Sequence, residues 1–206
     1  MDAVPGHFVY TSKLLKESLT TQQREYAFQA FELLFENVKP SQILEIGTSH
    51  GGTIQYIREK LNDLNSRSTK IRSYDIVDRE WYGRMRSTGI DIRVENVFTY
   101  NYHGLSNSDD IEDFIQQDGV TIVLCDGGLK RNEFKLLAPF LKKDDIIMAH
   151  DYIDTHENFI NNFKGKIWDW REIGLEDIEK VCTDYNLTPF MEDVFSNAAW
   201  ACRKKV

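Results

Sequence analysis

Cysteine is scarce in this sequence and is not arranged for zinc or disulfide chemistry. Its three cysteines, Cys125, Cys182 and Cys202, lie far apart, and no C-x-x-C pair of the kind that binds zinc is present. Small secreted domains that depend on disulfides carry a much higher density of cysteine. We therefore expect three reduced thiols that pack as small apolar side chains.

Long apolar runs and an excess of positive charge are also missing. No run approaches the roughly 18 apolar residues that span a bilayer, and the first residues, M-D-A-V-P-G-H-F, lack the basic and apolar segments of a secretion signal. The formal charge is −8, from 25 Lys and Arg against 33 Asp and Glu, which weighs against nonspecific binding to nucleic acid. We expect a soluble cytoplasmic protein that binds neither membranes nor nucleic acid.

With only four prolines and no repeat or linker-like tract, the 206 residues are expected to form a single α/β domain. We predict a helical N-terminal cap over 1–40 and a Rossmann-like core over 41–206. The cap is predicted from apolar residues at helical spacing, followed by Pro40. These residues are Tyr26, Ala27, Ala30, Phe31, Leu34 and Phe35.

From residue 43 onward, short apolar runs alternate with helical patterns, which predicts a mostly parallel sheet with right-handed crossovers. Near the end, two further strands joined by a short turn must pair antiparallel, so the sheet is mixed. The expected strands are 43–46, 71–76, 90–94, 120–125, 146–149, 187–191 and 197–202. The expected helices lie near 52–61, 111–115, 131–141 and 174–185.

The first predicted strand runs into a loop with three glycines, I-L-E-I-G-T-S-H-G-G. A phosphate-binding P-loop needs a Lys after its second conserved glycine, and none follows here. The dinucleotide fingerprint needs a glycine at position 49, which is Ser49. The pattern that remains is E-x-G-x-x-x-G-G, made by Glu45, Gly47, Gly51 and Gly52. A tight strand-to-helix turn without a ligand would leave the same pattern.

Polar residues also end the later strands. Asp75 ends the second strand, Asn96 follows the third, Asp126 ends the fourth and His150-Asp151 ends the fifth. Ligands bind beyond the carboxyl ends of the strands in open α/β sheets, so these side chains are candidates for a common site. The alternative is that Asp and Asn serve the turns that follow each strand.

Taken together, these motifs resemble class I S-adenosylmethionine (SAM)-dependent methyltransferases. The glycine loop is similar to their first motif. The succession V-T-I-V-L-C-D-G-G, L-L-A-P-F-L-K-K-D-D and I-I-M-A-H-D is similar to the pattern of small-molecule O-methyltransferases. The resemblance extends from about residue 43 to the closing strand pair. It implies a seven-stranded mixed sheet of order 3-2-1-4-5-7-6, with an antiparallel last strand and helices on both faces.

The resemblance also implies a binding site for SAM. The methionine end of the cofactor would be held at the glycine loop, the ribose by Asp75 and the adenine by Asn96. The loop residues concerned are Glu45, Gly47, Thr48, Ser49 and Gly51, with Asp126 beside them. A nicotinamide-dependent oxidoreductase and a SAM-binding module without catalysis are the alternatives.

Asp126 and Asp151 are the main clue to catalysis. If the fourth and fifth strands are neighbours, the two carboxylates emerge roughly 5 Å apart and repel unless a cation or a shared proton lies between them. One interpretation is Mg²⁺ or a similar ion held by Asp126, Asp151 and His150. Two observations weigh against a metal. A hard cation prefers oxygen ligands to imidazole. Lys130 lies four residues after Asp126, whereas the base of metal-dependent relatives lies three residues after the corresponding acid.

A second interpretation needs no metal. His150 removes the proton of the acceptor hydroxyl while Asp151 orients its ring. In the third, His150 and Asp151 are structural, a strand end and a helix cap. Lys130 is expected to be solvated at a helix start. Trp168 and Trp170 are expected in the core or, alternatively, along the wall of an acceptor pocket.

The acceptor is expected to be a small molecule such as a sugar or a secondary metabolite. D-G-G-L stands where nucleic-acid amino-methyltransferases carry a motif with two prolines, and no added recognition domain is visible. The sequence specifies neither the acceptor nor the oligomeric state.

Overall fold

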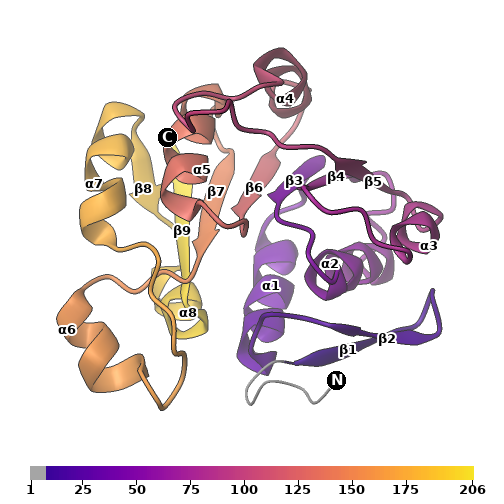
Figure 1. Cartoon of the computed structure of the whole chain (residues 1–206), viewed down its shortest axis with the longest axis horizontal. Helices are drawn as coiled ribbons and strands as arrows, with labels where there is room; N and C mark the ends of the chain where they lie inside the picture. The colour runs from indigo at the N-terminus through magenta and orange to yellow at the C-terminus, as the bar shows by residue number, and fades with distance from the viewer. Residues whose placement is uncertain (1–7) are drawn as a thin grey trace.

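A computed structural model describes residues 8–206 of the chain, which form a seven-stranded mixed sheet and a two-stranded hairpin (Figure 1). The order of the large sheet is β5-β4-β3-β6-β7-β9-β8, and β9 runs antiparallel to both of its neighbours. Counted from β3, this is the predicted order 3-2-1-4-5-7-6, so the predicted fold class is confirmed. The strands are β3 (Gln42–Ile46), β4 (Lys70–Asp75), β5 (Ile90–Val94), β6 (Thr121–Cys125), β7 (Ile146–His150), β8 (Leu187–Pro189) and β9 (Trp200–Lys205).

Helices cover both faces of the sheet, because successive side chains of each buried strand point to opposite sides. Ile43 of β3 belongs to one apolar cluster, whereas Leu44 belongs to the other. The first cluster includes residues of α1 (Glu25–Asn37), α2 (Gly52–Asp63), α3 (Tyr82–Arg86) and α8 (Glu192–Phe195). The second includes residues of α4 (Ser108–Ile115), α5 (Lys130–Leu137) and α7 (Leu175–Asp184).

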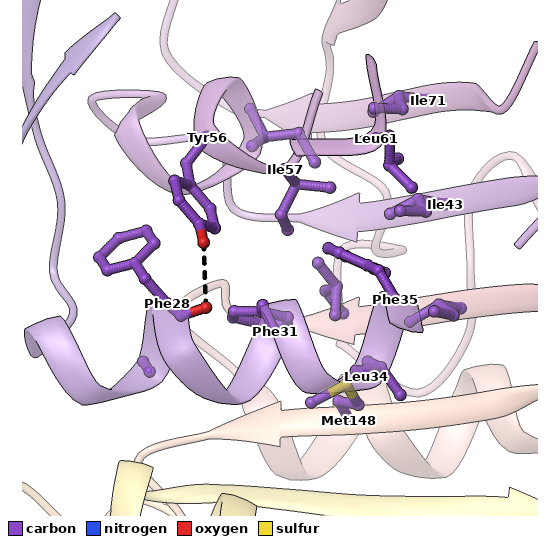
Figure 2. Packing of buried hydrophobic residues seen from close by; sticks show 14 of the residues in the cluster. Phe28, Phe31, Leu34, Phe35, Ile43, Tyr56, Ile57, Leu61, Ile71 and Met148 are labelled. Carbon is purple, nitrogen blue, oxygen red and sulfur yellow. Dashed lines mark hydrogen bonds between the residues drawn. The ribbon is translucent and has the colours of Figure 1, made fainter. Parts of the chain in front are cut away.

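Helix α1 is packed tightly against α2 and the sheet, as Figure 2 shows. The Tyr56 hydroxyl donates a hydrogen bond to the Phe28 carbonyl over 3.0 Å, which ties α2 to the first turn of α1. This packing holds the N-terminal end of α1, and Gln23, two residues before the helix, contacts Asp126. The apolar contacts come from Phe28, Phe31, Leu34 and Phe35 of α1 with Ile43, Ile57, Leu61 and Met148.

The predicted helical cap is only partly correct. The helix over 26–35 is confirmed as α1, but β1 (Val9–Ser12) and β2 (Glu17–Thr20) form a hairpin instead of a helix. Glu59 of α2 holds this hairpin, because its carboxylate accepts hydrogen bonds from the Tyr10 hydroxyl and the Lys13 N–H, each over 2.8 Å. Residues 1–7 of the predicted cap lie outside the described residues.

The closing strands are also connected differently from the prediction. Instead of a short turn, α8 and a 3₁₀ turn (Ser196–Ala198) lie between β8 and β9, although the pairing is antiparallel as expected. Three further elements were not predicted: α3, α6 (His156–Asn158) and a π-helical turn (Phe159–Phe163). All three cysteines are unpaired, as predicted. Within residues 8–206, no helix has the length and apolarity needed to cross a membrane.

Candidate functional site

A cavity of about 720 Å³ lies beyond the carboxyl ends of the central strands. This volume is within the range of roughly 300–1,000 Å³ that small-molecule sites occupy. Most of the predicted site residues meet here: Gly47, Ser49, Asp75, Asn96, Asp126, His150 and Asp151 all line it. Glu45, Thr48 and Gly51 do not line this cavity. They border a smaller hollow of about 20 Å³, which Gly47, Ser49 and Asp126 also line.

The glycine loop is shaped by close backbone approaches. Gly47 has φ of 100°, and a Cβ at this position would lie 2.4 Å from the Asp126 carbonyl oxygen, so only glycine lets the loop meet the end of β6. Gly51 has φ of 77° at the start of α2, and a Cβ there would lie 2.4 Å from the Met85 side chain. The loop is therefore a close-packed strand-to-helix turn that touches the Asp126 segment directly.

Asp75 organises the same loop from the neighbouring strand. Its Oδ2 accepts hydrogen bonds from the Ser49 N–H over 2.6 Å and from the Tyr82 hydroxyl over 2.9 Å, and its Oδ1 accepts from the Val77 N–H over 2.8 Å. A carboxylate offers about four acceptor positions, so about one remains for a ligand. Sequence reasoning missed Tyr82, because it lies on α3, which has no periodic apolar signal.

Asn96 is exposed at the rim of the cavity. Its Oδ1 accepts a hydrogen bond from the Phe98 N–H over 3.0 Å, which forms a local turn. An amide oxygen has a second lone pair, so the side chain can serve the turn and still contact a ligand. The geometry of Asn96 is compatible with a turn residue and with a contact to a ligand in the cavity.

Glu45 is fully enclosed at the end of β3. Burial raises the pKa of Glu45 to about 8, and the charges of Asp126 and Asp75 act in the same direction, while a hydrogen bond from the Ser73 hydroxyl opposes the rise. Ser73 also shares a hydrogen bond of 2.5 Å with the Thr48 hydroxyl. Glu45 is therefore mostly protonated at neutral pH, and a cationic ligand nearby would favour its ionised form.

Asp126, rather than Asp151, orients the ring of His150. His150 Nδ1 lies 2.9 Å from Asp126 Oδ1 and 3.7 Å from Asp151 Oδ1. The predicted orienting role of Asp151 is therefore wrong. Its backbone turns away with φ of 56°, whereas the parallel pairing of β6 with β7 brings the ends of the two strands together.

Gln23, which sequence reasoning missed, determines how this pair is hydrogen-bonded. The indole N–H of Trp200 can only donate, and it lies 2.8 Å from Gln23 Oε1. The amide nitrogen of Gln23 must then face the site, where it donates to Asp126 Oδ2 over 3.1 Å. With Nδ1–H of His150 donating to Asp126, Nε2 carries the lone pair of the ring. His150 lines the cavity and is only 2% exposed. No motif in the sequence marks Gln23.

Lys130 is buried, contrary to the expectation of a solvated residue. The residue is 6% exposed. Its ammonium donates to Gly127 O over 2.8 Å and to Glu172 Oε2 over 3.0 Å. The same ammonium lies 2.9 Å from Asp151 Oδ2. Burial alone would lower the pKa of Lys130, but the negative charges of Asp126, Asp151 and Glu172 raise it above its usual value. Lys130 is therefore a fixed cation and not a base.

Asp151 is held on both carboxylate oxygens. Oδ2 pairs with the Lys130 ammonium, and Oδ1 accepts a hydrogen bond from the Trp168 indole over 2.5 Å. Burial would raise the pKa of Asp151, but the His150 ring when it is protonated, the Lys130 ammonium and these hydrogen bonds keep that pKa below its ordinary value. Asp151 is an ionised member of a buried ion pair.

A divalent ion at Asp126, His150 and Asp151 does not find a free set of oxygen ligands. Asp151 is engaged as described, and His150 can offer only an imidazole nitrogen, which a hard cation takes less readily than oxygen. In the part of the chain that the structure describes, no three His, Cys, Asp or Glu side chains are grouped so that they could hold a metal ion. The assignment of a metal to these three residues stays a prediction.

The W-D-W-R-E segment contributes to the site as well as to packing. Trp168 is buried beside His150, with ring centroids 5.0 Å apart, and Trp170 is 47% exposed at the cavity.

Glu133, a further residue that was missed, is buried and accepts hydrogen bonds from the N–H groups of Gly127 and Leu129, each over 3.1 Å. It thereby fixes the loop after Asp126.

The fold matches solved methyltransferase structures over most of this chain. A structure of CmcI with Mg and SAM matches with a TM-score of 0.65 at 12% identity, covering 100% of this chain and 78% of that chain. The MycE methyltransferase of the mycinamycin biosynthetic pathway, with Mg and SAH, gives 0.51 at 15% identity, covering 87% and 48%. An O-methyltransferase family protein from Burkholderia thailandensis gives 0.52 at 9% identity, covering 87% and 55%.

The chain therefore has the class I methyltransferase fold, which confirms the resemblance of its motifs at the level of the fold. It spans about half the length of MycE and of the Burkholderia protein. No protein-family model and no curated protein matches the sequence.

Proposed function

We propose that this chain is a SAM-dependent methyltransferase that transfers a methyl group to an oxygen of a small-molecule acceptor. The observation that carries the proposal is the hydrogen-bonded Asp126–His150 pair, which lines a cavity that also reaches the glycine loop and Asp75. A hydroxyl acceptor needs a base within hydrogen-bonding reach, and this arrangement supplies one.

SAM supplies a methyl group already activated by its sulfonium. The residues present fit it: the loop at Gly47 approaches the Asp126 segment, and Glu45 offers a carboxyl to a cationic group. We assign the methionine end to Glu45, Gly47, Thr48, Ser49 and Gly51, the ribose to Asp75 and the adenine to Asn96. Asp126 lies between this end of the cavity and His150.

Proton removal is assigned to His150. In the transfer, the acceptor oxygen forms its bond to the methyl carbon as the carbon–sulfur bond breaks, and the electron pair of that bond stays on sulfur. The hydroxyl proton passes to Nε2 of His150, and Asp126 stabilises the resulting imidazolium through Nδ1–H. Asp126, His150 and Asp151 are thus the proposed catalytic group, in which Asp151 positions the surrounding side chains.

MycE and CmcI were solved with Mg, so transfer assisted by Mg²⁺ or another divalent cation is the alternative mechanism for the same reaction. MycE has also been solved in complex with mycinamycin VI, Mg and SAH. For the present chain, the exposed Trp170 and Glu172 beside the cavity support a small acceptor with both apolar and hydroxyl-bearing parts.

The cofactor assignment is tested by thermal shift and calorimetry. A ligand at 100 times its Kd stabilises a protein by roughly 2.7 kcal/mol, so SAM and its demethylated product SAH should each raise Tm. NAD should not. Stabilisation by NAD without stabilisation by SAM or SAH would overturn the assignment and favour an oxidoreductase.

Catalysis is tested separately, with SAM carrying a labelled methyl group and a panel of hydroxylated small molecules. Transfer of label to an acceptor oxygen, located by mass spectrometry and NMR, is the expected result. Transfer to nitrogen or carbon would contradict the proposed acceptor atom. Binding of SAM without transfer to any member of a broad panel would favour a cofactor-binding module.

A further inference from the structure

The ammonium of Lys130 contacts three oxygens at the wall of the cavity. The oxygens come from three separate segments: Gly127 O after β6 at 2.8 Å, Asp151 Oδ2 after β7 at 2.9 Å and Glu172 Oε2 before α7 at 3.0 Å. An ammonium has three N–H donors, and here each has an acceptor. None remains for the acceptor molecule.

One carbonyl and two carboxylate oxygens around a single point are also the kind of ligands that a hard divalent cation takes. The observed distances are those of hydrogen bonds to an ammonium, since Mg²⁺ would need oxygens at about 2.0–2.1 Å and Ca²⁺ at about 2.3–2.6 Å. A metal ion and the Lys130 ammonium therefore cannot share this position.

The charges around this point require a cation. Asp126 and Asp151 follow neighbouring strands, and Asp151 and Glu172 both contact the same ammonium. Carboxylates placed so closely repel each other unless a positive charge lies among them. Lys130 supplies that charge from within the chain, and its removal would leave the buried Asp151 carboxylate without a counter-ion.

We propose that Lys130 is the resident cation of the active site, occupying the position a divalent metal would take, so that this chain binds no divalent ion there and its transfer is metal-independent. Lys130 is a positioning residue that holds Asp151 and Glu172 against the loop after Asp126. The claim that the transfer is metal-independent rests on the proposed function. The claim that the Lys130 ammonium excludes a metal ion from these three oxygens does not.

The experiment therefore measures metal binding alone, without SAM or acceptor. Mn²⁺ binding is followed by electron paramagnetic resonance, and Mg²⁺ is tested by competition, for the wild type, Lys130→Met and Lys130→Met/Asp151→Asn. Lys142→Met is the matched control, because the Lys142 ammonium also meets a carbonyl and a buried carboxylate, that of Asp145. Among residues 8–206, Asp145 alone offers a carboxylate to this ammonium, so removal of the ammonium should create no site.

We expect no specific Mn²⁺ site in the wild type or in Lys142→Met. Lys130→Met should gain a site that saturates with one ion and is lost again in the double variant. Saturable Mn²⁺ binding by the wild type that Asp151→Asn abolishes would overturn the proposal, and so would a folded Lys130→Met protein that gains no site.

Lys130→Met leaves Asp151 buried without its counter-ion, and the variant is expected to have a lower Tm. Circular dichroism first confirms that it is folded, and the double variant should regain part of the lost Tm because the uncompensated charge is gone. If Lys130→Met does not fold, Lys130→Ala is measured with Mn²⁺ present from the start of refolding. Rescue by Mn²⁺ supports the proposal, and failure of rescue contradicts it. A negative SAM thermal shift would refute the proposed function while leaving these results unchanged.

Discussion

At the scale of single residues, Glu45 links cofactor binding to pH. Its pKa is raised to about 8 by burial in the free protein, so near pH 7 it is mostly neutral. Under the proposed function, the cationic cofactor lowers this pKa, and binding then releases a proton. Below about pH 8 the apparent affinity for SAM should increase with pH, by at most about tenfold per unit, and should level off above it.

Calorimetry in buffers of different ionisation enthalpy measures the released proton directly. Glu45→Gln should bind SAM without release, and its affinity should vary less between pH 6 and 8. Equal proton release by the wild type and by Glu45→Gln would show that another group is responsible.

His150 is the residue on which turnover should depend most. Replacing it by Gln keeps a hydrogen-bonding side chain but removes the base, so kcat should fall about 10²- to 10⁴-fold while the Kd for SAM changes little. The measurement is the steady-state rate of labelled methyl transfer at saturating SAM and acceptor, with an acceptor found by the screen. His156→Gln, an exposed histidine on α6, is the matched control. Unchanged kcat in His150→Gln would contradict the assignment of the base.

At the scale of elements, the start of α1 fixes the hydrogen bonding of the site through Gln23. Gln23→Leu would leave the buried Trp200 indole N–H without its acceptor and remove one donor from Asp126. An unsatisfied buried donor costs about 1–3 kcal/mol, so the free energy of unfolding should decrease by about that amount, as measured in urea. Gln29→Leu, on the exposed side of α1, should change it little. Equal effects of both substitutions would argue against this role of Gln23.

The sequence predicts elements well where an apolar pattern alone determines them. Strands β3, β6 and β7 follow from apolar runs such as T-I-V-L-C, because they are buried at every position. The hairpin before α1 could not be predicted in this way, since Glu59, 46 residues or more away along the chain, holds it. The same limit applies to α8, which replaces the expected turn between β8 and β9.

At the scale of the whole molecule, the topology accounts for most of what could be predicted about the site. Once β3, β4, β6 and β7 are parallel neighbours, their carboxyl ends meet, and the polar residues that follow them line one cavity. Contacts between distant segments are what the sequence does not reveal. Lys130 pairs with Glu172, 42 residues later, and the choice of Asp126 over Asp151 as the partner of His150 depends on a backbone turn.

The free energy of unfolding should depend on pH because two buried carboxyls, those of Glu45 and Glu133, have raised pKa values. Burial raises the pKa of Glu45 to about 8 and that of Glu133 to about 7, against about 4.3 for Glu in an unfolded chain. Between these values the folded protein binds more protons than the unfolded chain. Their contribution to stability is therefore fully present below about pH 4 and is lost as the pH rises through 7 to 8.

The expected loss is on the order of a few kcal/mol for each group. Urea unfolding of the apo protein from pH 5 to 9 measures it, with Glu45→Gln flattening part of the profile and Glu36→Gln, an exposed carboxyl on α1, leaving it unchanged. A wild-type profile that matches Glu45→Gln at every pH would contradict the late titration of Glu45.

The position of His150 between two indoles has an optical consequence. Its ring centroid lies 5.0 Å from that of Trp168 and 4.9 Å from that of Trp200. A protonated imidazole quenches the fluorescence of a neighbouring indole, whereas a neutral one does so much less. Protonation of His150 should therefore lower the emission of Trp168 and Trp200, two of the four tryptophans of the chain.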